Sequence, residues 1–284
     1  MRLTIRVPAT SANLGPGFDC LGLALELCNE VSIETGSTGV SWSGEGADEL
    51  PTDGGDRVSR TMAAVAAAAG RELPSFSLRG RNAIPLECGL GSSAAAAAAG
   101  VLAADALLGL GLGPGEIVSS AAGIEGHPDN AAAAVLGGLT IAVGDAVVRA
   151  EPHPSLSPAV LVPREHRQST QTARAALAEQ VPFSDAIFNV QHVALAVVAL
   201  TERPDLLRVA LDDRLHQAAR LALVPEAEAL YGSIRRAGLG VCVSGAGPSL
   251  LVFEGGGVLP DVGDGWEVLR PGVRSAGAEV DVRP

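Results

Sequence analysis

The sequence predicts an α+β protein of two lobes, and three observations carry this prediction. Strand patterns and helix patterns are intermixed along the 284 residues, without the regular alternation that a barrel or a doubly wound sheet requires. A cluster of prolines (Pro152, Pro154 and Pro158) interrupts the pattern and marks a boundary between residues 1–155 and residues 156–284. Hydrophobic residues make up 47% of the chain, which is enough for a sizeable core and argues against disorder.

In the first lobe, short alternating runs predict strands and Ala-rich runs predict helices. Gly70 closes one helix and Pro114 opens another, each at a position where that residue type is favoured. Residues 8–22 are rich in Pro, Gly and Asn and are expected to form a loop. The expected elements are strands at 2–7, 23–34, 40–43 and 76–79, helices at 57–69, 94–110, 114–122 and 130–136, and a hairpin of strands at 138–143 and 146–151.

In the second lobe, one strand is followed by a group of helices, and strand patterns then return. The strands are short apolar runs such as GVCVSG and SLLVFEG, bounded by Gly and Pro. The expected strands lie at 159–163, 240–245, 249–255, 266–272 and 278–282, and the expected helices at 170–180, 184–200, 203–211 and 225–237.

The basic residues are unusual, because all 20 of them are arginine. A phosphate-binding P-loop needs a lysine, and so do Schiff-base enzymes and protein kinases, so the sequence excludes these three classes. Any phosphate chemistry must therefore use arginine, backbone N–H groups, a helix terminus or a metal ion.

Charge, cysteines and hydropathy limit the partners and the cellular location that we expect. The net charge of −12 leaves no excess of arginine for a nucleic-acid backbone, so we expect no nucleic-acid partner. The four cysteines have neither CxxC nor zinc spacing and are expected to be reduced thiols of a cytoplasmic protein. The N-terminus has no apolar signal segment, and Gly and Asp interrupt the most apolar run, 94–110, so we expect no membrane span.

The strongest chemical signal is GLGSS at 89–93, directly before the long Ala-rich run. Small residues let the backbone approach a ligand, and Ser92 or Ser93 would cap the helix that follows. The free N–H groups of the first turn attract an anion, so the segment suits a di- or triphosphate without any lysine. A glycine-rich turn before a well-capped buried helix explains the same residues equally well.

A second signal is EGHPDN at 125–130, which places four polar side chains just before an apolar helix. A carboxylate near a phosphate loop usually holds Mg²⁺, which prefers oxygen ligands. Capping of the helix at 130–136 by Asp129 or Asn130 is the alternative, but it explains only one of the four side chains. A third signal, PATSANLGPGFD at 8–19, is by itself an irregular loop between strands.

Taken together, the motifs resemble those of the GHMP superfamily of small-molecule kinases and, within it, the homoserine kinases. The resemblance spans nearly the whole chain, and the motifs agree in order and spacing. The segments that carry it are PATSANLGPGFDCLG at 8–22, IPLECGLGSSAA at 84–95, EGHPDNAAAAVLGG at 125–138, STQTAR at 169–174, DRLHQAAR at 213–220 and SGAGPSLL at 244–251.

The resemblance implies a fold and an activity. The fold is the two-lobed GHMP kinase fold, with a mixed α/β nucleotide-binding lobe over 1–155 and a ferredoxin-like lobe over 156–284. The activity is Mg²⁺-assisted transfer of phosphate from ATP to the side-chain hydroxyl of L-homoserine, which gives O-phospho-L-homoserine, a step toward threonine. The resemblance also suggests a homodimer.

The resemblance assigns the site residues as well. The ATP triphosphate is expected to contact Pro85, Leu86, Glu87, Cys88, Gly89, Leu90, Gly91, Ser92, Ser93, Ala94 and Ala95, and Mg²⁺ to contact Ser93 and Glu125. The homoserine pocket is expected to contain Asn13, Asp19, His127, Thr170, Arg174, Arg220 and Gly245. Asp19 suits the substrate ammonium, and the two arginines suit its carboxylate. Asn130 would orient the hydroxyl or the γ-phosphate, and Arg174 would stabilise charge on the transferring group.

Phosphoryl transfer depends on positioning and charge neutralisation more than on a strong base. Some relatives carry an Asp base near the position of Thr170, whereas homoserine kinases lack it, so we expect no dedicated carboxylate base. Two alternatives remain. The first is another kinase of the superfamily, acting on mevalonate, shikimate or a sugar. The second is a non-catalytic binding module on the same fold.

Four histidines and one cysteine are given structural and not chemical roles. Homoserine kinases often have Arg where this chain has Gln191-His192, and His192 is interpreted as a core histidine. The histidines at 153, 166 and 216 are interpreted as surface or structural residues. Cys88 lies inside the phosphate loop, where the family requires no thiol, and is interpreted as filler.

Overall fold

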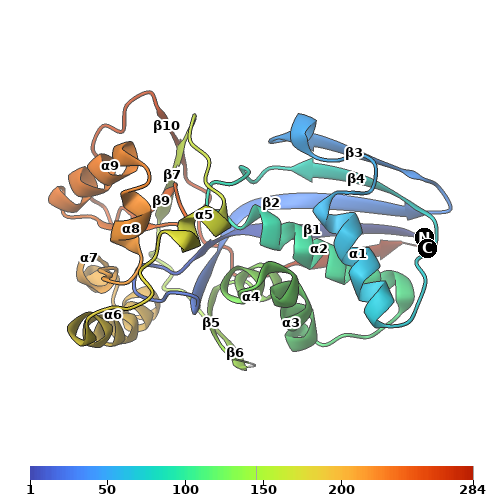
Figure 1. Cartoon of the computed structure of the whole chain (residues 1–284), viewed down its shortest axis with the longest axis horizontal. Helices are drawn as coiled ribbons and strands as arrows, with labels where there is room; N and C mark the ends of the chain where they lie inside the picture. The colour runs from blue at the N-terminus through green and yellow to red at the C-terminus, as the bar shows by residue number, and fades with distance from the viewer. Residues whose placement is uncertain (145, 284) are drawn as a thin grey trace.

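The computed structural model describes residues 1–144 and 146–283, and within them the strands form two sheets in two lobes (Figure 1). The larger sheet has seven strands in the order β11-β1-β2-β4-β3, and β5 and β6 extend it beyond β2. Its strands are β1 (Arg2–Ala12), β2 (Leu21–Thr35), β3 (Gly39–Gly44), β4 (Phe76–Asn82), β5 (Leu139–Val143), β6 (Ala146–Ala150) and β11 (Glu279–Arg283).

Four helices cover one face of the larger sheet (Figure 1). They are α1 (Arg57–Ala68), α2 (Ser92–Leu108), α3 (Pro114–Glu125) and α4 (Asp129–Leu136). Helices α2 and α4 pack directly on β1, and α1 and α3 pack against α2. The alanines of α2 permit this close packing because their side chains are small, and Ala97 and Ala98 are completely buried. The Ala-rich run is therefore the central helix of the first lobe.

The second lobe has a four-stranded sheet in the order β10-β7-β9-β8, with helices packed on it. Its strands are β7 (Pro158–Pro163), β8 (Gly240–Val243), β9 (Leu250–Phe253) and β10 (Trp266–Leu269), and its helices are α5 (Thr170–Ala175), α6 (Phe183–Thr201), α7 (Leu207–Ala210), α8 (Gln217–Leu221) and α9 (Pro225–Arg236). Short 3-10 helices span Ala47–Glu49 and Pro204–Leu206. The predicted two-lobed α+β architecture is confirmed.

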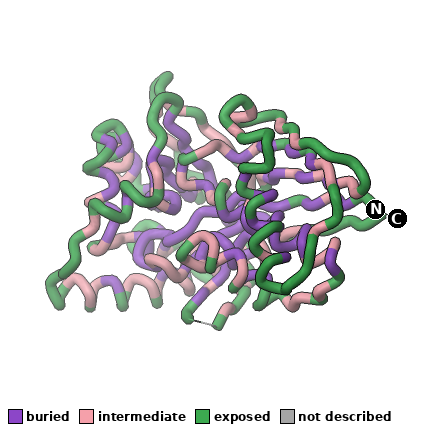
Figure 2. The backbone as a smooth tube through the Cα atoms, turned by 45° about the vertical axis from the view of Figure 1, so that its right-hand side comes forward, coloured by how far each residue is buried: buried purple, intermediate pink, exposed green. Residues whose placement is uncertain are grey.

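One continuous core joins the two lobes. Figure 2 shows buried backbone running through the middle of the molecule. Leu14 from the first lobe belongs to the same buried cluster as Val160 and Leu251 of the second sheet. The loops that project from both lobes at this junction are therefore held by shared packing.

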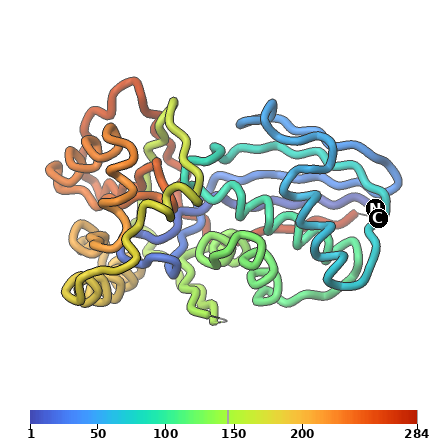
Figure 3. The backbone as a smooth tube through the Cα atoms, in the orientation of Figure 1, coloured from blue at the N-terminus to red at the C-terminus, as the bar shows by residue number. Residues whose placement is uncertain are grey.

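The last strand returns to the first lobe. Strand β11 pairs antiparallel with β1, so that Arg283 lies opposite Arg2 and the two termini lie side by side (Figure 3). The division at residue 155 stays a prediction, and this strand shows that the chain crosses back over it. Because the pairing joins the two ends of the sequence, no local pattern indicates it.

Several predicted boundaries are wrong. The predicted loop over 8–22 is strand as far as Ala12 and strand again from Leu21, because β1 and β2 pair along this stretch after a bulge at Pro8. The helix predicted over 170–180 ends at Ala175, and the short helix α8 was not predicted.

Helix α6 has 19 residues and is apolar enough to cross a membrane by length and composition alone. One such helix is weak evidence of a membrane span. Ala196, Ala199 and Leu200 of α6 are completely buried in the protein, whereas Phe183 and Val190 are exposed. The run at 94–110 that the sequence singled out forms the shorter helix α2.

Candidate active site

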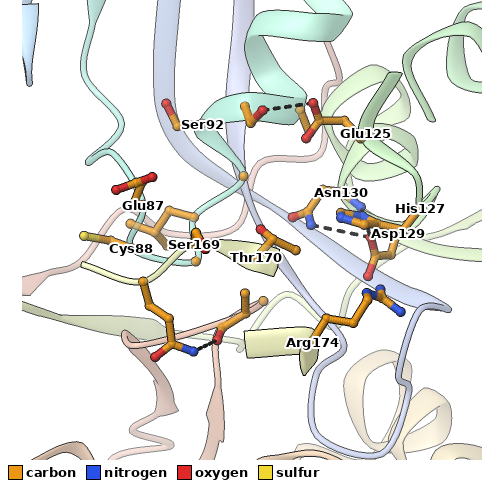
Figure 4. Close-up of a pocket in the computed structure, with 18 of the residues that line it drawn as sticks. Glu87, Cys88, Ser92, Glu125, His127, Asp129, Asn130, Ser169, Thr170 and Arg174 are labelled. Carbon is orange, nitrogen blue, oxygen red and sulfur yellow. Dashed lines mark hydrogen bonds and ion pairs between the residues drawn. The ribbon is translucent and has the colours of Figure 1, made fainter. Parts of the chain in front are cut away.

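A cavity of about 550 Å³ lies where loops of both lobes meet (Figure 4). It is lined by all of the residues predicted for homoserine, metal and catalysis, and by most of the predicted phosphate loop. These lining residues are Asn13, Asp19, Pro85, Glu87, Cys88, Gly89, Leu90, Gly91, Ser92, Ser93, Ala94, Glu125, His127, Asn130, Thr170, Arg174, Arg220 and Gly245. Leu86 and Ala95 do not line it: Leu86 lies against Gly46, and Ala95 is buried in the core.

The glycines of the phosphate loop have conformations that other residues rarely adopt. Gly89 and Gly91 have φ of 75° and 68°, in the left-handed region. A Cβ at Gly89 would meet the carbonyl oxygen of Ser244, and one at Gly91 would meet the Thr10 hydroxyl. The loop therefore passes close to the Thr10 side chain of the first lobe and the Ser244 backbone of the second, because it carries no side chains at these two positions.

Helix α2 begins at Ser92, and its N-terminus faces the cavity. The prediction that Ser92 or Ser93 caps this helix is wrong: Gly91 occupies the cap position, with no side-chain hydrogen bond, because its left-handed conformation starts the helix directly. The first N–H groups of α2 donate no hydrogen bond to any described residue. They are available to an anion, and the helix dipole favours one there.

Ser93 and Glu125 meet at the end of the cavity beside α2. The Ser93 hydroxyl donates a hydrogen bond to Glu125 Oε1 at 2.9 Å, and Arg57 Nη1 lies 3.7 Å from the same oxygen. Within residues 1–144 and 146–283, no three His, Cys, Asp or Glu side chains are grouped as a metal site. A hydroxyl beside a carboxylate still fits Mg²⁺, which commonly takes its other ligands from phosphate oxygens and water.

His127, Asp129 and Asn130 form one hydrogen-bonded group at the start of α4. Asp129 Oδ1 lies 3.0 Å from His127 Nδ1 and accepts a 2.7 Å bond from the Asn130 backbone N–H. The hydrogen bond between His127 and Asp129 raises the pKa of His127 despite the opposing effect of burial. Asn130 Oδ1 in turn accepts a 2.7 Å bond from Thr10. Asp129 is 2% exposed, and its carboxylate orients the His127 and Asn130 side chains.

Asp19 and Arg174 form an ion pair across the cavity. Arg174 Nη1 and Nη2 donate hydrogen bonds of 2.9 and 2.7 Å to the two oxygens of Asp19. This contact raises the pKa of Arg174. The Arg174 guanidinium also lies 5.3 Å from the centre of the Phe18 ring. A positive and a negative group are thus available at neighbouring points of the wall.

Arg220 is the buried cation of the site, with 4% of its surface exposed. Its Nη1 donates a 2.6 Å hydrogen bond to the Gly245 carbonyl oxygen, which also accepts a 2.8 Å bond from Asn13 Nδ2. Arg220 forms no ion pair with a described carboxylate, and its Nε has no partner among the described residues. Burial lowers the pKa of Arg220 to about 10, so the guanidinium stays charged at neutral pH.

Some lining residues were not predicted. Arg57 is the first residue of α1, and no sequence motif marks it as a site residue. The packing of α1 against α2 brings it close to Glu125. Gln168 joins two loops, because its N–H donates to Glu87 and its side-chain amide donates to Ala246. Its position directly before the STQTAR segment is the one sequence signal that marks it.

The interpretation of Cys88 as a buried filler residue agrees with its surroundings, whereas His192 is only half-buried and is not a core histidine. Burial raises the pKa of Cys88 to about 11, and its thiol donates to the Leu86 carbonyl oxygen. His192 Nδ1 lies 2.8 Å from the Phe188 carbonyl oxygen, and its ring stacks on Phe188 at 3.7 Å. His216 is not at the surface: it is buried and touches Arg220.

The chain is similar in sequence and in structure to known small-molecule kinases. The family models "GHMP kinases N terminal domain" and "GHMP kinases C terminal" match residues 56–138 and 196–253. Homoserine kinases from Rhodococcus erythropolis and Streptomyces coelicolor are 44% and 40% identical, over 89% and 97% of this chain and 86% and 93% of their own. The solved homoserine kinase of Cytophaga hutchinsonii has a TM-score of 0.83 at 26% identity, over 99% of this chain and 97% of its own. The Methanococcus jannaschii mevalonate kinase shares the fold, with a TM-score of 0.66 at 14% identity over 88% of this chain and 90% of its own.

Proposed function

The chain belongs to the homoserine kinases of the GHMP kinase family and is an ATP-dependent kinase, and we propose that it phosphorylates the side-chain hydroxyl of L-homoserine. The product is O-phospho-L-homoserine, an intermediate on the route to threonine. The observation that carries the proposal is the arrangement of charges in one cavity: the Asp19–Arg174 pair beside the buried Arg220, which forms no ion pair with a carboxylate that the structure describes.

The homoserine end of the cavity suits an amino acid because it presents both charges. The buried Arg220 gains most from a carboxylate, since an unpaired buried charge is costly. Arg174, which pairs with Asp19 in this structure, would exchange that partner for the same carboxylate, and Asp19 would then accept the substrate ammonium. An alcohol without these two groups leaves the buried Arg220 without a carboxylate partner, which gives a reason for selection of homoserine over a sugar and, with the ammonium site at Asp19, over mevalonate or shikimate.

The other end of the cavity suits a triphosphate. The N-terminus of α2 offers N–H groups that donate to no residue within the described part of the chain, and Arg57 adds a cation in a chain that has no lysine. Ser93 and Glu125 would hold Mg²⁺. When bound, Mg²⁺ supplies charge neutralisation on the phosphate oxygens. Arg57 would then turn from Glu125 toward the nucleotide.

The proposed reaction is a direct displacement. A bond forms between the homoserine hydroxyl oxygen and the γ-phosphorus, the bond to the β,γ-bridging oxygen breaks, and ADP leaves. Asn130 orients the hydroxyl or the γ-phosphate, and Arg174 stabilises charge on the transferring group. The hydroxyl proton passes to an oxygen of the transferred phosphate, so no protein carboxylate is required.

Asp129 is considered as a base because it lines the cavity directly beside Asn130, the residue that would orient the reacting hydroxyl. Its Oδ1 accepts from the Asn130 N–H and lies against His127, so this oxygen is occupied by protein partners. Thr170 stands exposed at the start of α5, where it offers a hydroxyl and no carboxylate. The hydroxyl at Thr170 supports transfer without a dedicated base, and whether the other oxygen of Asp129 acts as one is decided by the kinetics of Asp129→Asn.

An ADP-release assay with Mg-ATP and a panel of L-homoserine, mevalonate and shikimate tests the function. We expect turnover with L-homoserine alone. Turnover of another alcohol in its place would move the chain to a different substrate class. Binding of ATP without turnover of any alcohol would favour a binding module. We further propose that the enzyme is cytoplasmic and forms a homodimer. Its partner is a small-molecule substrate, and it binds neither nucleic acid nor a membrane.

A further inference from the structure

His216 is a buried histidine that no step of the proposed reaction uses. It is 1% exposed and directly precedes α8, one helical turn before Arg220. Its two ring nitrogens have different partners. Nε2 lies 2.7 Å from the Gly15 carbonyl oxygen, and Nδ1 lies 3.2 Å from Arg220 Nη1.

These two partners fix the protonation of the ring. A carbonyl oxygen only accepts hydrogen bonds, so Nε2 must carry the proton. A guanidinium only donates, so Nδ1 must be unprotonated and accept. The imidazole is therefore neutral and held in one tautomer. Burial lowers the pKa of His216 despite the nearby Asp213 carboxylate, and Arg220 lowers it further, in agreement with this geometry.

The position of His216 is itself fixed by the protein. Asp213 Oδ2 accepts hydrogen bonds of 2.8 Å from the backbone N–H groups of His216 and Gln217. Asp213 Oδ1 accepts a 2.7 Å bond from Asn189 of α6. The ring of Phe18 packs against the imidazole, with 5.2 Å between the ring centres. Contacts from three segments of the chain thus hold this imidazole.

Arg220 depends on His216 for its own position. The guanidinium makes hydrogen bonds to two described groups, the Gly245 carbonyl oxygen and His216 Nδ1, both through Nη1. It also lies 5.2 Å from the centre of the Phe18 ring. Without an ion pair to a described carboxylate, these contacts decide where the buried cation faces.

We propose that His216 is a positioning residue, whose unprotonated Nδ1 orients the Arg220 guanidinium for the carboxylate of the substrate. This role rests on the proposed function, because the carboxylate belongs to homoserine. It differs from a general packing role in one respect: the acceptor at Nδ1 matters for substrate binding, whereas the donor at Nε2 fastens the ring to the loop at Gly15.

Two substitutions separate these contacts. His216→Asn places an acceptor near the former Nδ1, and His216→Gln places a donor near the former Nε2. We expect His216→Gln to raise the KM for L-homoserine about tenfold to a hundredfold, because a hydrogen bond to a charged group is lost. The KM for ATP should stay within about twofold of the wild-type value, and His216→Asn should restore most of the homoserine KM. Exposed His166, replaced by Gln, is the matched control.

Equal increases of the homoserine KM in the Asn and Gln variants, or a parallel rise in the ATP KM, would reduce His216 to a packing residue. Nitrogen NMR of the wild-type imidazole tests the contact even if a variant fails to fold. We expect a protonated Nε2 and an unprotonated Nδ1 at pH 7, and a protonated Nδ1 would overturn the proposal. Failure of the proposed function is recognised separately, because wild-type enzyme would then not turn over homoserine while the tautomer remained measurable.

Discussion

Arg174 of α5 donates hydrogen bonds of 2.9 and 2.7 Å to both carboxylate oxygens of Asp19, which follows β1 by seven residues. The pair joins the two lobes across the mouth of the cavity. Each member is the natural partner of one end of a zwitterion: Arg174 of a carboxylate, Asp19 of an ammonium. A substrate that carries both charges can thus engage the pair and keep every charge partnered.

Asp19→Asn removes the negative member of the pair and keeps its shape. We expect the KM for L-homoserine to rise about tenfold to a hundredfold, because a charge-assisted hydrogen bond to the ammonium is lost. The KM for ATP should change little. Asp205→Asn is the control, since Asp205 makes an equally bidentate pair with Arg203 at the exposed surface. Steady-state kinetics measure both constants. An unchanged KM for L-homoserine would show that Asp19 does not bind the substrate ammonium.

Asp129→Asn tests transfer without a carboxylate base. The amide keeps an oxygen for the Asn130 N–H but has no basic site, so we expect kcat to fall by less than about tenfold. Single-turnover rates at saturating ATP and homoserine measure the chemical step. A loss of about a thousandfold or more in a variant with wild-type thermal stability would identify Asp129 as the base.

His127 makes the stability of the protein depend on pH through its contact with Asp129. The contact raises the pKa of His127 above its ordinary value of about 6.5. Its stabilisation is therefore fully present below the unfolded-state pKa and is lost as pH rises through the folded-state pKa. We expect the free energy of unfolding of wild type to exceed that of His127→Gln most at pH 5.5, with the gap narrowing by pH 8.5.

Urea unfolding at each pH measures this gap, with His166→Gln showing what the loss of an exposed histidine does on its own. A gap that widens with rising pH would mean that the neutral imidazole is the form the folded state prefers. The direction in which the gap changes with pH therefore tells which form of His127 the folded state prefers, and no absolute pKa is needed.

Arg57→Gln tests the nucleotide end of the cavity. Arg57 lies 3.7 Å from Glu125 and lines the cavity beside the N-terminus of α2. We expect its loss to raise the KM for ATP about tenfold and to leave the KM for homoserine nearly unchanged. Arg60→Gln, one turn further along the exposed side of α1, should leave both constants at wild-type values. Equal effects of the two substitutions would mean that Arg57 acts only through the net charge of the protein and makes no specific contact with ATP.

The parts of the site that sequence predicted are those whose chemistry is local. The loop at 89–93 and the EGHPDN segment keep their ligand groups within a few residues, so their composition indicates their use. The contact of His216 with Gly15 could not be predicted, because the two residues lie 201 positions apart in the sequence. The Ser92 cap was wrong for a local reason: Gly91 adopts a left-handed conformation that starts the helix without a side chain.

The fold shows the same division. Alternation and Ala-rich runs predicted the strands and helices of the first lobe, including the hairpin of β5 and β6. The extension of β1 to Ala12 depends on pairing with β2, which overrides the loop preference of Pro8. The place of β11 depends on the opposite end of the chain. Boundaries and pairings of this kind follow from tertiary contacts.

The central claim is that the charges of Asp19, Arg174 and Arg220 select an alcohol that bears both an ammonium and a carboxylate. The most direct test compares kcat/KM for L-homoserine with the values for 4-hydroxybutyrate, which lacks the amine, and 3-aminopropan-1-ol, which lacks the carboxylate. Because each analogue leaves a charged group of the site unpartnered, we predict a loss of about a hundredfold or more for either one. Values within about threefold of that for L-homoserine would contradict the account.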